Sequence, residues 1–152
     1  MTRRRAAVLA VAIAAAALAP VAIAAPQITT LKLVEVTTLQ KLVDSPPAQR
    51  SKSQPLSPGD IVVVRANLLS AGEVVGTADF FGVVTAFPRI AFYGTFSLPG
   101  GKISIVDVGS LTAASQTFAV VGGTGRYAGV RGIDRERRIG EGRNAVELEL
   151  TT

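Results

Sequence analysis

Residues Asn144 to Thr151 (NAVELELT) alternate between apolar and polar side chains. Val146, Leu148 and Leu150 fall on one face, and two glutamates fall on the other. Successive side chains of a β-strand point to opposite faces, so this alternation predicts a strand with one buried and one solvated face.

The same period of two recurs upstream, where β-branched residues are abundant, and it predicts short strands throughout. The eight predicted strands are Leu31–Leu39, Asp60–Ser70, Glu73–Thr85, Ile90–Leu98, Lys102–Val108, Ser115–Val121, Arg131–Ile139 and Asn144–Thr151. The one long irregular stretch, Asp44 to Pro58, is rich in Pro and Ser and predicts a loop. Eight mostly sequential antiparallel strands predict an all-β closed barrel, because closure leaves no exposed sheet edge.

The composition excludes several kinds of chemistry. The chain has 152 residues with no cysteine and no histidine, so it has no disulfide, thiolate nucleophile or imidazole base. A metal site built from His or Cys is excluded for the same reason, and we expect no metal. Any catalysis must therefore use carboxylates, Lys, Arg, Tyr or hydroxyl groups.

The N-terminal segment has the pattern of a secretory signal. Three arginines in residues 1–5 precede an uncharged run over 6–25, which ends in the small-residue motif Ala22-Ile23-Ala24. We interpret residues 1–24 as a signal peptide cleaved near Ala24, which leaves a secreted or extracytoplasmic domain over 25–152. A retained membrane anchor is the alternative, although the run is mostly alanine and contains Pro20.

The predicted mature domain is nearly neutral, since three of the 16 basic residues lie in the signal and the chain has 11 acidic residues. The densest charges lie between Arg131 and Arg143 and mix both signs, which is typical of a solvated strand face. We therefore expect no nucleic-acid partner, and contact with a membrane only through an uncleaved signal.

The glycine-rich segment Gly123 to Ala128 (GTGRYA) matches a dinucleotide-binding pattern with Ala in the last position. That pattern binds pyrophosphate only at the N-terminus of a helix. Here it is followed by further glycines, charges and a strand. The segment therefore predicts a tight corner at the rim of a barrel rather than a nucleotide site.

This region also carries a resemblance to a known family. Phe118 to Tyr127 (FAVVGGTGRY), followed by Gly129-Val130-Arg131-Gly132, resembles the signature of the allene oxide cyclase and dirigent-protein barrel superfamily. Weaker matches follow the family's order, at Pro58-Gly59-Asp60, Leu68-Leu69-Ser70 and Val75-Gly76-Thr77. The resemblance implies an eight-stranded barrel, often trimeric, whose apolar cavity holds an unstable small molecule in one conformation while it cyclises or couples. It implies no cofactor.

Glu35 is the first candidate for a catalytic residue. It shares a predicted strand face with three leucines, and an acid on an apolar face is costly to bury unless it is paired or functional. The cyclases that the chain resembles carry a Glu at the matching place, followed two residues later by an Asn where this chain has Thr37. The opposite register, with Val34 and Val36 inward and Glu35 in solvent, remains open.

The resemblance also implies catalytic roles for Asn67, which matches an Asn that holds a water near the substrate oxygen in plant cyclases, and for Arg131, which matches a dirigent arginine. Gly82 stands where the plant cyclases have a Cys, and Arg126 where many coupling dirigent proteins have an Asp, so the chain keeps part of either active site. The candidate ligand-binding residues are Leu33, Thr37, Ser45, Pro46, Phe81, Phe92, Tyr93 and Phe96.

Three functions are compatible with these features. The leading hypothesis is an exported barrel that binds an apolar or amphipathic small molecule and steers its cyclisation or coupling without a cofactor, with a homotrimer or homodimer as the expected assembly. The second is a lipocalin-like carrier that leaves its ligand unchanged. The third is a structural or interaction barrel filled by its own side chains.

Overall fold

The computed structural model describes residues 27–45 and 55–152. The predicted signal peptide and Pro46 lie outside these ranges. The described elements are β1 (Ile28–Val43), β2 (Ile61–Ser70), β3 (Glu73–Ala86), β4 (Arg89–Leu98), β5 (Gly101–Ser110), β6 (Ser115–Gly123), the 3-10 turn η1 (Gly125–Tyr127), β7 (Arg131–Gly140) and β8 (Arg143–Thr151). The eight predicted strands are confirmed, although β1 is longer at both ends than the sequence pattern indicated.

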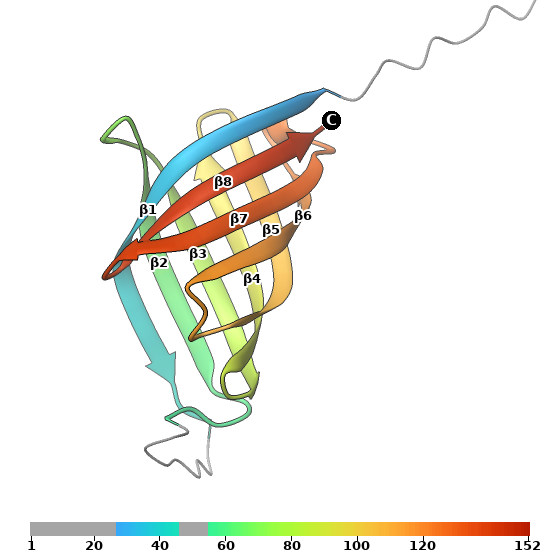
Figure 1. Cartoon of the computed structure of the whole chain (residues 1–152). Coiled ribbons are helices and arrows are strands. Elements are labelled where there is room, and N and C mark those ends of the chain that lie inside the picture. The colour runs from blue at the N-terminus through green and yellow to red at the C-terminus, as the bar shows by residue number, and fades with distance from the viewer. Residues whose placement is uncertain (1–26, 46–54) are drawn as a thin grey trace, which may run out of the picture.

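Each strand pairs antiparallel with the next, and β8 pairs with β1 to close the barrel (Figure 1). The prediction of an all-β closed barrel is therefore confirmed. Within the described ranges, no helical segment has the length and hydropathy of a membrane span.

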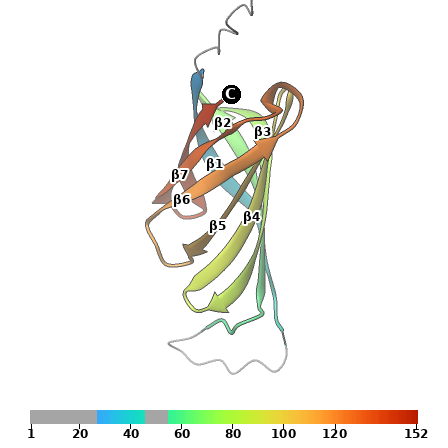
Figure 2. The ribbon, with the colours of Figure 1, turned by 90° about the vertical axis from the view of Figure 1, so that its right-hand side faces the viewer.

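Two register shifts shape one side of the barrel. In β1 the pairing with β2 shifts between Thr37 and Leu39, and in β7 the pairing with β8 shifts between Arg138 and Gly140. Because β8 begins at Arg143, the second half of β1 pairs with β2 alone. The β7–β8 hairpin consequently ends about halfway down the barrel in Figure 1, while β2 to β4 continue below it. Figure 2 shows β6 and β7 crossing the upper half only.

Two clusters of buried side chains fill the ends of the lumen. The larger cluster lies towards η1 and includes Phe96, Ile103 and Leu148, which have no exposed surface. The smaller cluster joins Val62, Val84 and Ile90 at the end where β2 begins. The alternation of the strands places these side chains inside, because successive residues of a strand face opposite sides of the sheet.

The glycine-rich segment forms the tight corner that its sequence predicted. Gly125 has a φ of +60°, and a Cβ at this position would collide with the carbonyl oxygen of Gly100. The backbone N–H of Arg126 donates to that same oxygen at 2.8 Å. The single 3-10 turn ends at Tyr127, whose ring is buried in the larger cluster, so the segment provides no helix for a pyrophosphate.

Candidate functional site

A cavity of about 390 Å³ lies in the lumen between the two buried clusters. Its apolar wall comes from seven side chains, of which six lie on β2 to β6 and one lies in the loop between β5 and β6. The six are Val62, Val64, Phe80, Phe92, Ile105 and Phe118, and the loop residue is Leu111. Its polar wall comes from β1, β7 and β8, and the β7–β8 hairpin forms part of its rim. This combination of apolar walls and a few convergent polar groups is typical of a small-molecule site.

The register of β1 places Glu35 inside the barrel. Leu33 and Glu35 are both buried, whereas Val34 and Val36 lie on the outer side. The alternative register that would expose Glu35 is therefore wrong. Glu35 is 3% exposed, and its Oε1 accepts a hydrogen bond from Nδ2 of Asn144 at 3.4 Å. Its Oε2 is shielded from solvent and has no hydrogen-bond partner.

Two further carboxyls enter the lumen from β7. Asp134 lies opposite Leu148, and Glu136 lies opposite Val146, so both share the inward face of these buried β8 residues. Asp134 has no exposed surface. The prediction that the Arg131 to Arg143 segment is simply a solvated face is wrong at these two positions, although Arg131, Arg135 and Arg137 are exposed.

Burial raises the pKa of all three carboxyls. The pKa of Glu35 rises from 4.5 to about 8, because burial disfavours its charge and Glu136 adds repulsion, while the Asn144 hydrogen bond opposes the rise. Burial likewise raises the pKa of Glu136 to about 8, and both the charge of Asp134 and a hydrogen bond with it add to the rise. Burial raises the pKa of Asp134 to about 7, against the hydrogen bond with Glu136.

These shifts mean that the cluster holds protons at neutral pH. Glu35 and Glu136, with pKa values of about 8, are mostly protonated at pH 7. The arrangement can therefore donate or accept a hydrogen bond at the cavity wall and can exchange a proton with a ligand. In the part of the chain that the structure describes, no group of three or more acidic side chains is arranged to hold a metal ion.

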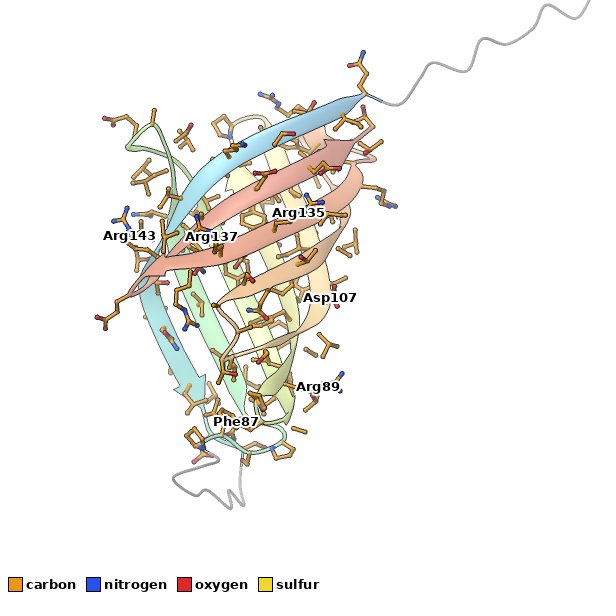
Figure 3. All side chains as sticks on the ribbon, viewed as in Figure 1. Phe87, Arg89, Asp107, Arg135, Arg137 and Arg143 are labelled. Carbon is orange, nitrogen blue, oxygen red and sulfur yellow. The ribbon has the colours of Figure 1, made fainter. Side chains whose placement is uncertain are left out.

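The rim of the cavity is positively charged as well as polar. Arg138 and Arg143 border it together with Glu141, and all three side chains are exposed. Figure 3 shows Arg143 beside the tip of the β7–β8 hairpin, away from the lower end of the barrel where Phe87 lies. Gln40 joins the rim from β1 because the register shift after Thr37 turns it inward, opposite Val64.

Four of the candidate ligand-binding residues face the lumen. Thr37 and Phe92 line the cavity. Leu33 and Phe96 point inward but belong to the larger buried cluster, where Phe96 is fully enclosed and packs edge-on against Phe80 at a centroid distance of 5.6 Å. Sequence reasoning thus identified the inward face of β1 and β4 without locating where the cavity ends.

Two aromatic candidates lie outside the barrel. Phe81 is 46% exposed and Tyr93 is 49% exposed, and the two are paired neighbours on the outer face of β3 and β4. Their assignment to the cavity is wrong, because Phe80 and Phe92 occupy the adjacent inward positions and side chains alternate along a strand.

Asn67 and Arg131 are also placed away from Glu35. Asn67 lies on β2 between two residues with no exposed surface, Ala66 and Leu68, so its own side chain is on the outer face. Arg131 is exposed at the start of β7, where its guanidinium donates to the carbonyl of Val130 at 2.8 Å. Neither side chain lines the cavity.

Ser45 has a role at the end of β1 rather than at the cavity wall. Its backbone N–H donates to Oδ1 of Asp60 at 2.9 Å. The same buried carboxyl accepts hydrogen bonds from the backbone N–H and the hydroxyl of Ser57. Asp60 therefore links the segments of chain that precede and follow residues 46–54. Pro46, which follows Ser45, lies outside the described residues.

Sequence reasoning missed Asp134, Glu136 and Asn144. A signal for Asn144 was available, because it continues the inward series of Val146 and Leu148 on β8. For Asp134 and Glu136 the pattern indicated the outer face, because Ile133 alternates with them and an apolar residue is the expected inward one on β7.

Comparisons with known proteins support the fold. No protein-family model matches the chain, and no curated protein matches it in sequence. Among solved structures, a pyocyanin demethylase matches with a TM-score of 0.71 and 23% identity, over 80% of this chain and 99% of that chain. A pterocarpan synthase dirigent protein matches with a TM-score of 0.64 and 19% identity, over 83% of this chain and 84% of that chain.

A Diels-Alderase from Streptomyces koyangensis matches with a TM-score of 0.66 and 20% identity, over 83% of this chain and 68% of that chain. At these identities the likeness concerns the fold. The chain therefore shares a closed-barrel fold with these proteins, a dirigent protein among them, and the fold that the resemblance in sequence implied is confirmed.

Proposed function

We propose that this protein binds an apolar or amphipathic small molecule in its lumen and steers the cyclisation or coupling of that molecule without a cofactor. The observation that carries the proposal is the 390 Å³ cavity with a phenylalanine-rich wall and the buried Glu35 carboxyl. An apolar wall limits the conformations of a bound substrate, and a fixed carboxyl can orient one polar atom of it. Most of the rate enhancement would then come from positioning.

Proteins that share the fold lend support. They include dirigent proteins, a cyclase described as catalysing a [4 + 2] cycloaddition, and Diels-Alderases, which by their names act on small molecules. A filled structural barrel is disfavoured by the cavity. A carrier without chemistry is disfavoured by the convergence of Glu35, Glu136 and Asn144 on one cavity wall.

The experiment that tests this proposal is analysis, by liquid chromatography and mass spectrometry, of the small molecules that co-purify with the protein. We expect a compound with the native protein and none with Val64→Phe, because Val64 lines the cavity and a larger ring would fill it. Val63→Phe is the matched control, since Val63 lies next to it and does not line the cavity. Retention of the compound by Val64→Phe would contradict binding in the lumen.

Turnover is tested separately with the recovered compound. Incubation with fresh protein is expected to produce an isomer of the same mass or a coupled product, and Glu35→Gln is expected to change the rate or the product distribution. Recovery of unchanged compound alone would favour the carrier. Unchanged chemistry in Glu35→Gln would remove Glu35 from the mechanism.

We also propose that the protein is exported, with residues 1–24 as the cleaved signal and 25–152 as the mature domain. The arginines of residues 1–5, the uncharged run and the Ala22-Ile23-Ala24 motif support this. N-terminal sequencing of protein recovered outside the cytoplasm is expected to begin at Ala25. A mature chain that begins at Met1 would contradict cleavage.

A homodimer or homotrimer forms part of the same proposal. Val63, Phe81, Tyr93 and Val106 follow one another across the outer face of β2 to β5 as directly paired residues. The last three are each at least 40% exposed, and a contiguous apolar patch on an outer face is typical of an interface. Light scattering of the native protein and of Phe81→Lys tests this, with dissociation of the variant as the expected result.

A further inference from the structure

The acid-lined side of the cavity holds buried carboxyl oxygens that have no hydrogen-bond partner. Oε2 of Glu35 and Oε1 of Glu136 are both shielded from solvent and have no hydrogen-bond partner. The amide of Asn144 is already used on the other oxygen of Glu35. A buried acceptor without a donor costs about 1–3 kcal/mol, so a ligand that brings donors to this wall gains affinity.

The same wall also lacks a counterion. β2 to β6 contribute no titratable side chain to the cavity, and Asp134 adds a third carboxyl behind Glu35 and Glu136. Among residues 27–45 and 55–152, the cations at the cavity are Arg138 and Arg143, which lie at the rim with exposed side chains, accompanied by Glu141. None of the ion pairs among the described residues involves a carboxyl of the cluster.

The register brings the two cavity-lining carboxyls to either side of β8. Glu35 on β1 lies opposite Asn144, and Glu136 on β7 lies opposite Val146, which is the next inward residue of β8. Arg138 pairs with Asn144 and is therefore one inward position nearer the rim than Glu136. A group between the two carboxyls would thus lie deeper than the arginine, in reach of the aromatic wall.

We propose that the ligand of this lumen carries a protonated amine, which lies between Glu35 and Glu136 while its apolar body packs against Phe80, Phe92 and Phe118. This inference rests on the proposed binding in the lumen and adds the charge of the ligand. Its N–H groups would satisfy the unpartnered acceptors, its charge would supply the missing counterion, and the phenylalanine rings favour a nearby cation. Above about pH 8, where these carboxyls ionise, a neutral or anionic ligand would leave them unpaired.

Proton release is a direct consequence of this arrangement. Burial raises the pKa of Glu35 and Glu136 to about 8, and a bound cation favours the ionised form of both, so binding expels protons. Affinity for a cation therefore increases with pH as the cluster loses its protons. An alkylammonium stays charged through this range because its pKa is close to that of lysine, about 10.

The test is calorimetric titration of the purified protein with decylammonium, 1-decanol and decanoate, which share one chain length and differ in charge. At about pH 8 decylammonium is expected to bind about tenfold more tightly than 1-decanol, as charge-assisted hydrogen bonds of the usual strength would give. The ratio is expected to shrink at about pH 6, where the cluster is protonated. Protons released on binding are measured by repeating the titration in buffers of different ionisation enthalpy.

Glu35→Gln and Glu136→Gln are each expected to lower the affinity for decylammonium by about tenfold and to leave the affinity for 1-decanol unchanged. Glu147→Gln is the matched control, because Glu147 faces outward on β8 near Lys32 and its loss should change neither affinity. Each of the three variants replaces a carboxyl by an amide of nearly the same shape, and its melting temperature verifies folding.

The outcomes separate the two proposals. Equal or tighter binding of 1-decanol or decanoate at about pH 8 would overturn the cationic ligand and leave binding in the lumen standing. Tight decylammonium binding that survives both substitutions would also overturn it. Failure of all three probes, together with no compound co-purifying with the native protein, would overturn binding in the lumen itself.

Discussion

The two halves of the lumen are walled by neighbouring stretches of the same strands, yet they hold opposite kinds of side chain. Towards η1 the inward positions carry Phe96, Ile103 and Leu148, which pack together without exposed surface. Towards the β7–β8 hairpin they carry Glu35 and Glu136 beside an open volume. Burying unpaired acids costs free energy, so the packed half must supply the stability that the open half gives up.

The largest expected effect comes from emptying the packed half. Phe96→Ala is expected to lower the free energy of unfolding by about 4 kcal/mol, because it removes a fully buried ring and leaves a void between close-packed neighbours. Its edge-on contact with Phe80 is lost as well. Urea denaturation followed by circular dichroism measures the change.

Phe92→Ala is the matched control in the open half. Phe92 lines the existing cavity, although its ring also meets Phe118 edge-on at 5.7 Å. Removing it enlarges a space that is already present, so we expect about half the loss of Phe96→Ala. Equal losses in the two variants would mean that the halves do not differ in packing.

The second prediction concerns the pH dependence that the open half imposes on the whole barrel. In the folded protein the pKa of Glu35 and of Glu136 is about 8, against 4.5 without burial, so between these values the folded state binds more protons than the unfolded chain. Stability therefore falls as pH rises. Between about pH 7 and about pH 9 we expect the free energy of unfolding to drop by about 3 kcal/mol.

Urea titrations across this range measure the slope. The control is the variant with Glu35→Gln, Asp134→Asn and Glu136→Gln together, which is expected to lose most of the slope because the shifted groups are gone. Stability of the native protein that rises with pH would contradict protonated carboxyls in the lumen.

The third prediction isolates one buried charge. Asp134 lies opposite Leu148 with no exposed surface, and burial raises its pKa to about 7. Asp134→Asn is expected to stabilise the barrel by about 1 kcal/mol at about pH 8, and to have little effect at about pH 5, where the carboxyl is already neutral. Thermal melts at the two pH values measure this, and a destabilisation at the higher pH would refute it.

The same comparison shows what the sequence could predict. Period-two alternation predicted all eight strands, and the apolar residues of β8 predicted its inward face, because both depend only on neighbouring residues. Glycine chemistry predicted the corner at Gly125. These features belong to the packed half, where the inward residues are apolar except for Asp134 opposite Leu148, and the pattern agrees with the fold.

The open half could not be predicted because it depends on a register shift. In the hairpin, Gly140 pairs with Arg143, and an uninterrupted ladder would place Glu136 opposite the outward Glu147. The bulge at Ile139 moves the pairing by one residue, so Glu136 lies opposite the inward Val146 instead. Without the bulge, alternation would place Ile133 and Ile139 inside the barrel. With the bulge, Asp134 and Glu136 lie inside instead.

The smallest expected effect comes from an acid on the outer face of these same strands. Glu149 on β8 accepts from a guanidinium nitrogen of Arg135 at 2.9 Å, and both side chains are more than 40% exposed. Water screens this pair, so Glu149→Gln is expected to cost at most about 0.5 kcal/mol, and less as salt is added. Urea denaturation at low and high ionic strength measures the change. Asp134 lies close by, on the opposite face of the β7–β8 pair. If Glu149→Gln lowered the free energy of unfolding by as much as Asp134→Asn raises it, burial would not explain the difference between the two acids.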